Sequence, residues 1–220
     1  MISAIKSIKA VVLAGLIGLG LGIQAGDLKA TETHVIVVAG GCFWCVEKDF
    51  ESVRGVSEVV SGFTGGSVEN PTYKQVVRGG TGHYEAVQIF YNPDVITPAQ
   101  LYAMFFRSID PTDAGGQFCD RGASYRSAIF VSDATQNAAA QSALKDAQQA
   151  LGQQIVTPIL QAVKFYPAEA YHQDYYKQTA IILTRFGPKS KANAYKAYRE
   201  ACGRDQRVRQ LWGSSAPFVS

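Results

Sequence analysis

The chain has 220 residues, of which 47% are hydrophobic and 18% are charged, and its formal net charge is +3 at pH 7. This composition is ample for a sizeable core and excludes a disordered or fibrous protein. The net charge includes three lysines before Thr31, so the rest of the chain is close to neutral and has no basic patch that would indicate nucleic-acid binding.

The N-terminal segment has the layout of a secretory signal. Lys6 and Lys9 precede an uncharged apolar run over residues 10–23, and the small residue Ala25 follows shortly after. The run is shorter than the ~20 residues that a membrane span needs, and it is rich in glycine. These features favour a cleaved signal peptide over residues 1–25 rather than an uncleaved anchor. We therefore predict an exported, periplasmic protein with no membrane span after signal cleavage.

Strands and helices alternate along the remainder of the chain. We expect strands at 34–40, 56–66, 83–92, 125–132 and 161–167 and helices at 42–53, 97–105, 134–151 and 191–205. The short connections in the middle predict an α+β fold, a two-layer sandwich in which helices pack on a mixed, ferredoxin-like β-sheet. No repeat or long low-complexity linker interrupts residues 31–220, which are predicted to form one domain ending in a helix and a polar tail.

The sequence GGCFWCVE, residues 40–47, places two cysteines where the first strand turns into the first helix. Free backbone N–H groups and the helix dipole stabilise a thiolate there, so Cys42 is predicted to be a nucleophile. Cys45 lies three residues further on, within disulfide range on a helical path, and a CxxC at a helix start indicates redox chemistry. Half of a metal site, a static disulfide and a thioredoxin-like oxidoreductase are alternatives at this point.

Two large rings, Phe43 and Trp44, separate the cysteines. A disulfide exchanger more often has a small or proline-containing pair at these positions. Rings of this size could belong to the core, but directly after a nucleophile they favour an apolar pocket for a substrate group.

Further motifs follow in a fixed order. They are GFTGG, PTYKQVV, GGTGHYEAVQIFYNP, IDPT, CDRGASYRSAIF and FYPAEAYHQDYY. Together with GGCFWCVE, they resemble the A-type peptide-methionine sulfoxide reductases over about residues 35–176, most of the chain after the signal.

The resemblance implies thiol-dependent reduction of the S epimer of methionine sulfoxide, free or in proteins, by an α/β-roll type of two-layer α+β domain. Cys42 would attack the sulfoxide sulfur, while Phe43 and Trp44 would hold the S-methyl group. Four further residues would serve the sulfoxide oxygen or orient the site: Glu85 as the acid, Tyr73 and Tyr125 as hydrogen-bond donors, and Asp120 as an orienting residue.

The chemistry of a sulfoxide requires these residue types. Its sulfur is electrophilic, and its oxygen leaves only when it is protonated, so the site needs a thiolate on one side and a proton donor on the other. A carboxyl group in a dry pocket can stay neutral near pH 7 and act as that donor. Two phenols add donors that do not ionise at the working pH.

Attack on the sulfoxide would leave Cys42 as a sulfenic acid, which a second thiol must resolve to a disulfide. Cys45, at a position where many members of the family have Gly, and Cys202, near a C-terminal tail expected to be mobile, are the candidates for this second thiol. A relay through both is also open. Cys119 replaces the Asn that usually precedes Asp120 and is interpreted as a small filler.

We expect no metal and no bound organic cofactor, because no nucleotide or flavin motif is present. The chain's four cysteines are too few for a disulfide scaffold, and exported thiols must be kept reduced, so the expected partner is a thioredoxin-like dithiol. We expect a monomer, and structural roles for His83 and His172 through hydrogen bonds that hold loops. Two other functions stay open: a thiol–disulfide oxidoreductase, and a non-catalytic module for methionine-rich or metal-carrying partners.

Overall fold

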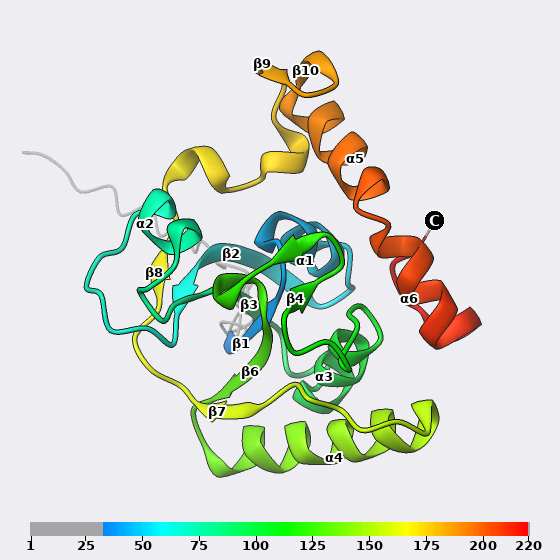
Figure 1. Cartoon of the computed structure of the whole chain (residues 1–220). Coiled ribbons are helices and arrows are strands. Elements are labelled where there is room, and N and C mark those ends of the chain that lie inside the picture. The colour runs from blue at the N-terminus through cyan, green and yellow to red at the C-terminus, as the bar shows by residue number, and fades with distance from the viewer. Residues whose placement is uncertain (1–32, 220) are drawn as a thin grey trace, which may run out of the picture. The chain divides into compact units, whose positions relative to one another are not determined.

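A mixed six-stranded sheet lies at the centre of the computed structural model, which describes residues 33–219 (Figure 1). The strand order is β7-β6-β1-β3-β2-β8. Strands β6 and β7 run parallel, and the other neighbouring pairs are antiparallel. The strands are β1 His34–Gly40, β2 Val56–Thr64, β3 Tyr84–Tyr91, β6 Ser127–Val131, β7 Ile159–Gln161 and β8 Tyr166–Pro167.

Three helices pack with alternate strand side chains in the main core: α1 Phe43–Glu51, α3 Pro98–Phe106 and α4 Ala134–Leu151. Ile36 and Val38 of β1 belong to this core, together with Phe50 and Phe105 from the helices. Strand residues of the other parity form a smaller cluster that includes Ala39 and its neighbours on β3 and β6. The predicted α+β sandwich with a mixed sheet is confirmed.

The helix ends follow local sequence signals. The Thr97 hydroxyl accepts a hydrogen bond from the Gln100 N–H at 3.3 Å, and Pro98 occupies the first position of α3, as predicted. Asp133 caps α4 in the same way, accepting from the Gln136 N–H at 2.8 Å. These helices begin where the sequence alone indicates.

The predicted strand at 161–167 is wrong. The chain pairs with β6 in β7, leaves the sheet after the Ala162 N–H has donated to the Val131 carbonyl at 2.8 Å, and pairs again only in β8 at the opposite edge. Ala162 and Phe165 pack on the smaller cluster between the two strands. Their apolar character therefore reflects a crossing over the sheet and not a ladder within it.

The predicted helix at 191–205 is confirmed as α5 Lys191–Ala201, but it ends earlier than predicted and a second helix, α6 Arg204–Trp212, follows it. Gly203 separates them with φ of 71°, a conformation that ends helices. The tail is packed rather than mobile, since the buried Trp212 donates from Nε1 to the Ile109 carbonyl at 3.2 Å. Helix α2 Tyr73–Arg78 and the hairpin of β9 Ile181–Thr184 and β10 Gly187–Ser190 were not predicted.

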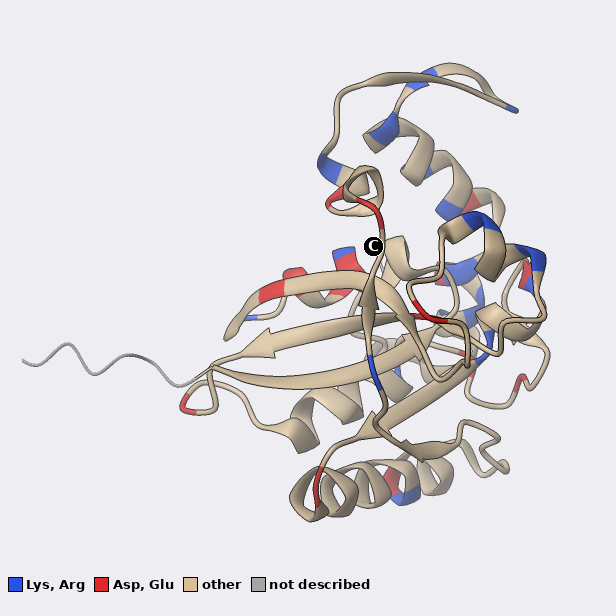
Figure 2. Ribbon diagram, turned by 90° about the vertical axis from the view of Figure 1, so that its left-hand side faces the viewer, with Lys and Arg blue, Asp and Glu red and all other residues tan. Residues whose placement is uncertain are grey.

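Residues 191–219, here called the C-terminal arm, follow this hairpin along one side of the sheet (Figure 1). Lysine and arginine recur along the hairpin and the two helices of the arm (Figure 2). No acidic residue occurs from 175 to 199. The arm therefore brings positively charged side chains, such as Arg199 and Arg204, close to Cys45.

The predicted signal peptide over residues 1–25 lies outside the described residues. Among residues 33–219, no helix combines the length and the apolar character that crossing a membrane requires.

Candidate active site

Cys42 lies between β1 and α1, at the N-cap position of the helix, as the sequence predicts. The turn before it depends on Gly41, whose φ is 81° and where an added Cβ would lie 2.6 Å from the Cβ of Gln117. Gln117 is itself fixed by two hydrogen bonds with the backbone of Asp110, at 2.9 and 2.8 Å. This locked turn sets the direction of the Cys42 side chain.

One pocket of about 540 Å³ brings together every residue predicted for the site. These residues come from α1, α2, β3, the segment 120–125 and the C-terminal arm. They are Cys42, Phe43, Trp44, Cys45, Tyr73, Glu85, Asp120, Tyr125 and Cys202.

Glu85 lies on β3, opposite Phe63 of β2, and is 1% exposed. Its Oε2 accepts a hydrogen bond from the Phe43 N–H at 3.1 Å, so the carboxylate binds a free N–H of the first turn of α1. Its Oε1 has no hydrogen-bond partner among the described residues. Burial raises the pKa of Glu85 to about 8, more than the Phe43 hydrogen bond lowers it. The carboxyl group therefore holds a proton at neutral pH.

Tyr73 begins α2, and Tyr125 ends the short 3₁₀ turn Ala123–Tyr125. Burial and the negative charge of Glu85 raise the pKa of both phenols above their ordinary value. Both hydroxyl groups thus remain protonated donors in the pocket. Asp120, beside them, has a pKa raised by burial.

An aromatic wall borders the cysteines. Trp44 stacks on Tyr175 with ring centroids 3.7 Å apart, and Phe43 is fully buried against Tyr73 at 6.0 Å. His172 packs behind this wall, with its ring centroid 5.2 Å from that of Phe43. Neither ring nitrogen of His172 has a hydrogen-bond partner within residues 33–219, so the expectation of a loop-holding hydrogen bond is wrong for His172. His83 does hold a loop, through Gly66 N–H and the Val68 carbonyl.

Cys42 and Cys45 are both free thiols. A hydrogen bond to Cys45, together with burial, raises the pKa of Cys42. The same hydrogen bond, aided by the charges of Arg204 and Arg199, lowers the pKa of Cys45 to about 7 against the effect of its burial. The predicted stabilisation of a Cys42 thiolate by the helix is therefore not supported, because the two thiols titrate as one coupled pair in which the pKa of Cys42 is raised and that of Cys45 is lowered.

Two buried arginines of the C-terminal arm lie behind the cysteine pair, and the sequence analysis missed both. Arg199 donates from Nη1 to Asp49 Oδ1 at 2.9 Å and from Nη2 to Asp205 Oδ1 at 2.7 Å. Arg204 donates from Nη1 to the Gly40 carbonyl at 3.1 Å. The only signal in the sequence was their position on either side of Cys202.

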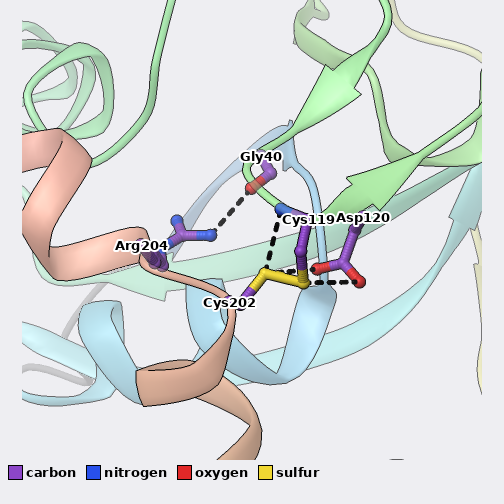
Figure 3. The surroundings of a disulfide bond; sticks show 5 residues. All are labelled: Gly40, Cys119, Asp120, Cys202 and Arg204. Atoms are coloured by element: carbon purple, nitrogen blue, oxygen red, sulfur yellow. Dashed lines mark hydrogen bonds between the residues drawn. A yellow bond between two sulfur atoms is a disulfide. The ribbon is translucent and has the colours of Figure 1, made fainter.

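Cys119 and Cys202 form a disulfide on the rim of the same pocket (Figure 3). The interpretation of Cys119 as a filler is therefore wrong. Cys119 lies in the turn between β4 Gly116–Gln117 and β5 Asp120–Arg121, while Cys202 ends α5. The Cys119 N–H donates to Cys202 Sγ at 3.1 Å, and the Asp120 carboxylate oxygens lie 3.9 and 3.8 Å from the two sulfurs.

Two groups of potential metal ligands occur among the described residues. In the first, Cys119, Asp120 and Cys202, the sulfurs are bonded to one another. In the second, the Glu47 carboxylate already accepts hydrogen bonds from the Ser61 hydroxyl at 2.7 Å and the Asp174 N–H at 2.6 Å. The pocket instead combines a dithiol, a neutral carboxyl group and two phenols with an apolar wall. These groups suit the cleavage of a polar bond to sulfur.

Comparisons with known proteins give one family. The family described as peptide methionine sulfoxide reductase matches residues 34–214. Peptide methionine sulfoxide reductase MsrA 2 of Caulobacter vibrioides is 46% identical over 193 residues, which are 88% of this chain and 92% of that protein. MsrA of Bacillus subtilis is 44% identical over 183 residues, 82% of this chain and 97% of that protein.

Solved structures of methionine sulfoxide reductases are also similar to this chain. Methionine sulfoxide reductase A of Corynebacterium diphtheriae superposes with a TM-score of 0.64 at 32% identity, over 68% of this chain and 76% of that chain. The reduced form of Mxr1 from Saccharomyces cerevisiae gives a TM-score of 0.63 at 32% identity, over 66% of this chain and 85% of that chain.

Proposed function

The chain belongs to the peptide methionine sulfoxide reductase family, and we propose that it reduces the S epimer of methionine sulfoxide, free or in proteins, to methionine. The observation that carries this proposal is a single pocket holding the Cys42 thiol and the buried Glu85 carboxyl, which keeps its proton up to a pH of about 8. Cleavage of a sulfur–oxygen bond requires a nucleophile and a proton donor of this kind.

The pocket also offers a basis for choosing one epimer. The S-methyl group would lie against Phe43 and Trp44, and the oxygen would face Glu85 and the two phenols. The approach of Cys42 fixes a third direction around the sulfur. Only one direction then remains for the rest of the methionine side chain. In one epimer this direction leads out of the pocket towards the peptide, and in the other it leads into the pocket.

The reaction begins when Cys42 passes its proton to the Cys45 thiolate and attacks the sulfoxide sulfur. Glu85 gives its proton to the oxygen, and the resulting hydroxyl group passes from the methionine sulfur to Cys42 Sγ as the bond between the two sulfurs breaks. Methionine leaves, and Cys42 is then a sulfenic acid. Cys45 then attacks the Cys42 sulfur, and water leaves as the disulfide forms. Cys45 is the first resolving residue in this scheme because its pKa is lowered to about 7 and it lies one helical turn from Cys42.

A dithiol must reduce the enzyme before the next cycle, and we propose a thioredoxin-like protein for this step, with no bound cofactor. We also propose that residues 1–25 direct export to the periplasm, where the enzyme would repair oxidised envelope proteins. Labelling of the mature N-terminus after expression with and without residues 1–25 tests this localisation. A cytoplasmic protein that keeps its first residues would contradict it.

A single-turnover assay tests the reductase. The chain is fully reduced, the reductant is removed, and a peptide with either the S or the R sulfoxide is added while methionine is counted. We expect methionine from the S epimer alone, and none from Cys42→Ser. Equal reduction of both epimers, or none of either, would contradict the proposal.

One observation favours a second candidate, a thiol–disulfide oxidoreductase, because Cys45 has a pKa of about 7 within a CxxC. This function would give rapid disulfide exchange with a protein substrate in Glu85→Gln as well as in the wild type. The reductase instead requires that Glu85→Gln loses methionine formation. A non-catalytic binding module would bind the sulfoxide peptide without turnover and would keep its function in Cys42→Ser.

A further inference from the structure

The hairpin of β9 and β10 has no assigned part in the reaction, although its turn reaches the pocket. We propose, on the basis of the reductase function above, that this hairpin is a docking surface for protein substrates. It binds an extended segment next to the oxidised methionine and favours segments that carry acidic residues.

The first argument is the position of the hairpin. Its turn consists of Arg185 and Phe186, and Arg185 lines the pocket that contains Cys42 and Glu85. The turn is held on α5, because the Arg185 guanidinium carbon lies 5.4 Å from the ring centroid of Tyr198 and the Phe186 ring centroid lies 5.5 Å from it. A peptide that leaves the pocket on this side therefore meets the hairpin directly.

The second argument is the outer side of β9. Ile182 packs inward on the cluster that contains Cys45, whereas Ile181 and Leu183 are 70% and 85% exposed. Among the described residues, the strand pairs only with β10. Leu183 lies opposite Pro188, which has no N–H, so this pair is not hydrogen-bonded and the backbone groups of Leu183 face the open edge. An extended peptide can add to an edge of this kind as a further strand.

The third argument is charge. No acidic residue occurs from 175 to 199, and Figure 2 shows lysine and arginine along the hairpin. Arg199 and Arg204, which also line the pocket, are buried and bound to groups of the chain itself. Arg185 is instead exposed, its guanidinium lies over the Tyr198 ring, and no carboxylate among the described residues pairs with it. It can therefore pair with a carboxylate of the substrate.

An extended peptide fits this surface better than a lipid surface or a second copy of the chain. The backbone of the peptide can hydrogen-bond along the open edge, its apolar side chains can cover Ile181 and Leu183, and its carboxylates can pair with Arg185. A lipid surface offers no backbone groups to the edge, and a second copy would bring the same positive charge to it.

The test compares peptides of one sequence in which S-methionine sulfoxide is flanked by aspartate, serine or lysine. Fully reduced enzyme reacts in a single turnover without external reductant, so binding of a reductant cannot contribute. The reference substrate is N-acetyl-methionine sulfoxide methylamide, which has no charge and no neighbouring residues. We expect the second-order rate constant of the aspartate peptide to be about three- to tenfold above that of the lysine peptide, because exposed ion pairs are weak. Added salt should remove this difference.

Three variants locate the effect. Arg185→Glu should reverse the ranking of the peptides, while the rate with the reference substrate stays within about twofold of the wild type. Leu183→Ser should slow all peptides about threefold and spare the reference substrate, because it removes exposed apolar contact area. Lys145→Glu is the matched control, since it makes the same change of charge at an exposed position of α4, and it should keep the wild-type ranking.

Equal rates for the peptides in the wild type, or a ranking that Arg185→Glu leaves unchanged, would overturn the docking surface. A dimer in sedimentation that Leu183→Ser separates would also overturn it and assign the edge to a second copy. Binding to phosphatidylglycerol vesicles without any ranking of the peptides would overturn it in favour of a lipid surface.

A different result would overturn the proposed function instead, namely no methionine from the reference substrate. Fluorescence anisotropy of the labelled peptides with the wild type then decides the docking surface, because binding requires no turnover. The aspartate peptide should still bind more tightly than the lysine peptide, and equal binding would overturn the docking surface as well.

Discussion

Glu85 holds one carboxylate oxygen on the Phe43 N–H, while the other has no hydrogen-bond partner among the described residues. Glu85→Gln keeps the shape of the side chain and can still accept from Phe43, but it cannot supply a proton to a leaving oxygen. We expect the single-turnover rate to fall by about 10²–10⁴-fold. Far-ultraviolet circular dichroism serves as the folding control. A rate within about threefold of the wild type would exclude Glu85 as the donor.

The pH dependence follows from two groups. The reaction needs a deprotonated cysteine pair, so the single-turnover rate should rise through the pKa of Cys45, about 7. It also needs a protonated Glu85, so the rate should fall above the pKa of that group, about 8. The expected profile is a narrow bell, and Glu85→Gln should lose its descending limb. A descending limb that persists in the variant would belong to another group.

The raised pKa of Glu85 should also make the free energy of unfolding depend on pH. The folded pKa of Glu85, about 8, lies above the ordinary carboxyl value, so the folded chain keeps a proton that the unfolded chain has released. This contribution is complete below the unfolded pKa, ~4.3, and is lost as the pH rises through the folded pKa. Burial of the charged form then costs on the order of 5 kcal/mol. In urea unfolding, Glu85→Gln should therefore gain stability relative to the wild type between about pH 5 and 8, and equal gains at both ends would contradict the assignment.

At the scale of elements, Arg204 fastens the C-terminal arm to the rest of the chain. Arg204 is 2% exposed, and its guanidinium donates to the Gly40 carbonyl before Cys42 and to the Ser108 carbonyl after α3, at 3.1 and 3.0 Å. Arg204→Met leaves both carbonyls without these donors and removes a charge that lowers the pKa of Cys45. We expect a loss of about 2–4 kcal/mol in the free energy of unfolding and a higher pKa for Cys45.

Arg204→Lys is the matched control for this prediction. It keeps the positive charge but not the planar fork that reaches two carbonyls. Stability should fall as in Arg204→Met, while the pKa of Cys45, followed through the ultraviolet absorbance of the thiolate, should stay near its wild-type value. If both variants raise that pKa equally, the charge of Arg204 is not its cause.

The elements that were predicted correctly have strong local sequence signals. Strand β1 is a run of β-branched residues stopped by two glycines, and α3 has both its cap and its first-turn proline. The elements that were missed depend on distant partners. Helix α2 buries only Val76, and β9 exposes Ile181 and Leu183, so neither shows the periodicity of a segment that faces the core.

At the scale of the whole molecule, the sequence motifs identify the site residues, but only the fold shows how deeply these residues are buried and which charges lie near them. Burial of Glu85, and hence its raised pKa, follows from its place on a central strand of the sheet. The Arg199–Asp49 pair joins residues 150 positions apart, and Cys119 bonds to a cysteine 83 positions away. No local pattern indicates such contacts, so the sequence around Cys119 does not reveal its partner.

The long-range disulfide also has a consequence for stability. A bond across 83 positions restricts the unfolded chain, so its reduction should lower the free energy of unfolding by ~4 kcal/mol. Urea unfolding of the wild type with and without a dithiol measures this change. Cys119→Ser/Cys202→Ser should resemble the reduced wild type and should not respond to the dithiol.

Noncovalent contacts also hold the C-terminal arm, so the chain should remain folded when this bond is reduced. These contacts are the Arg204 hydrogen bonds and the hydrogen bond from the buried Trp212 to the Ile109 carbonyl. Hydrogen exchange of the reduced chain should therefore increase in the C-terminal arm and the 116–121 turn, while β1, β3 and α1 stay protected. Exchange that increases throughout the sheet would mean that the disulfide, and not these contacts, holds the arm and the sheet together.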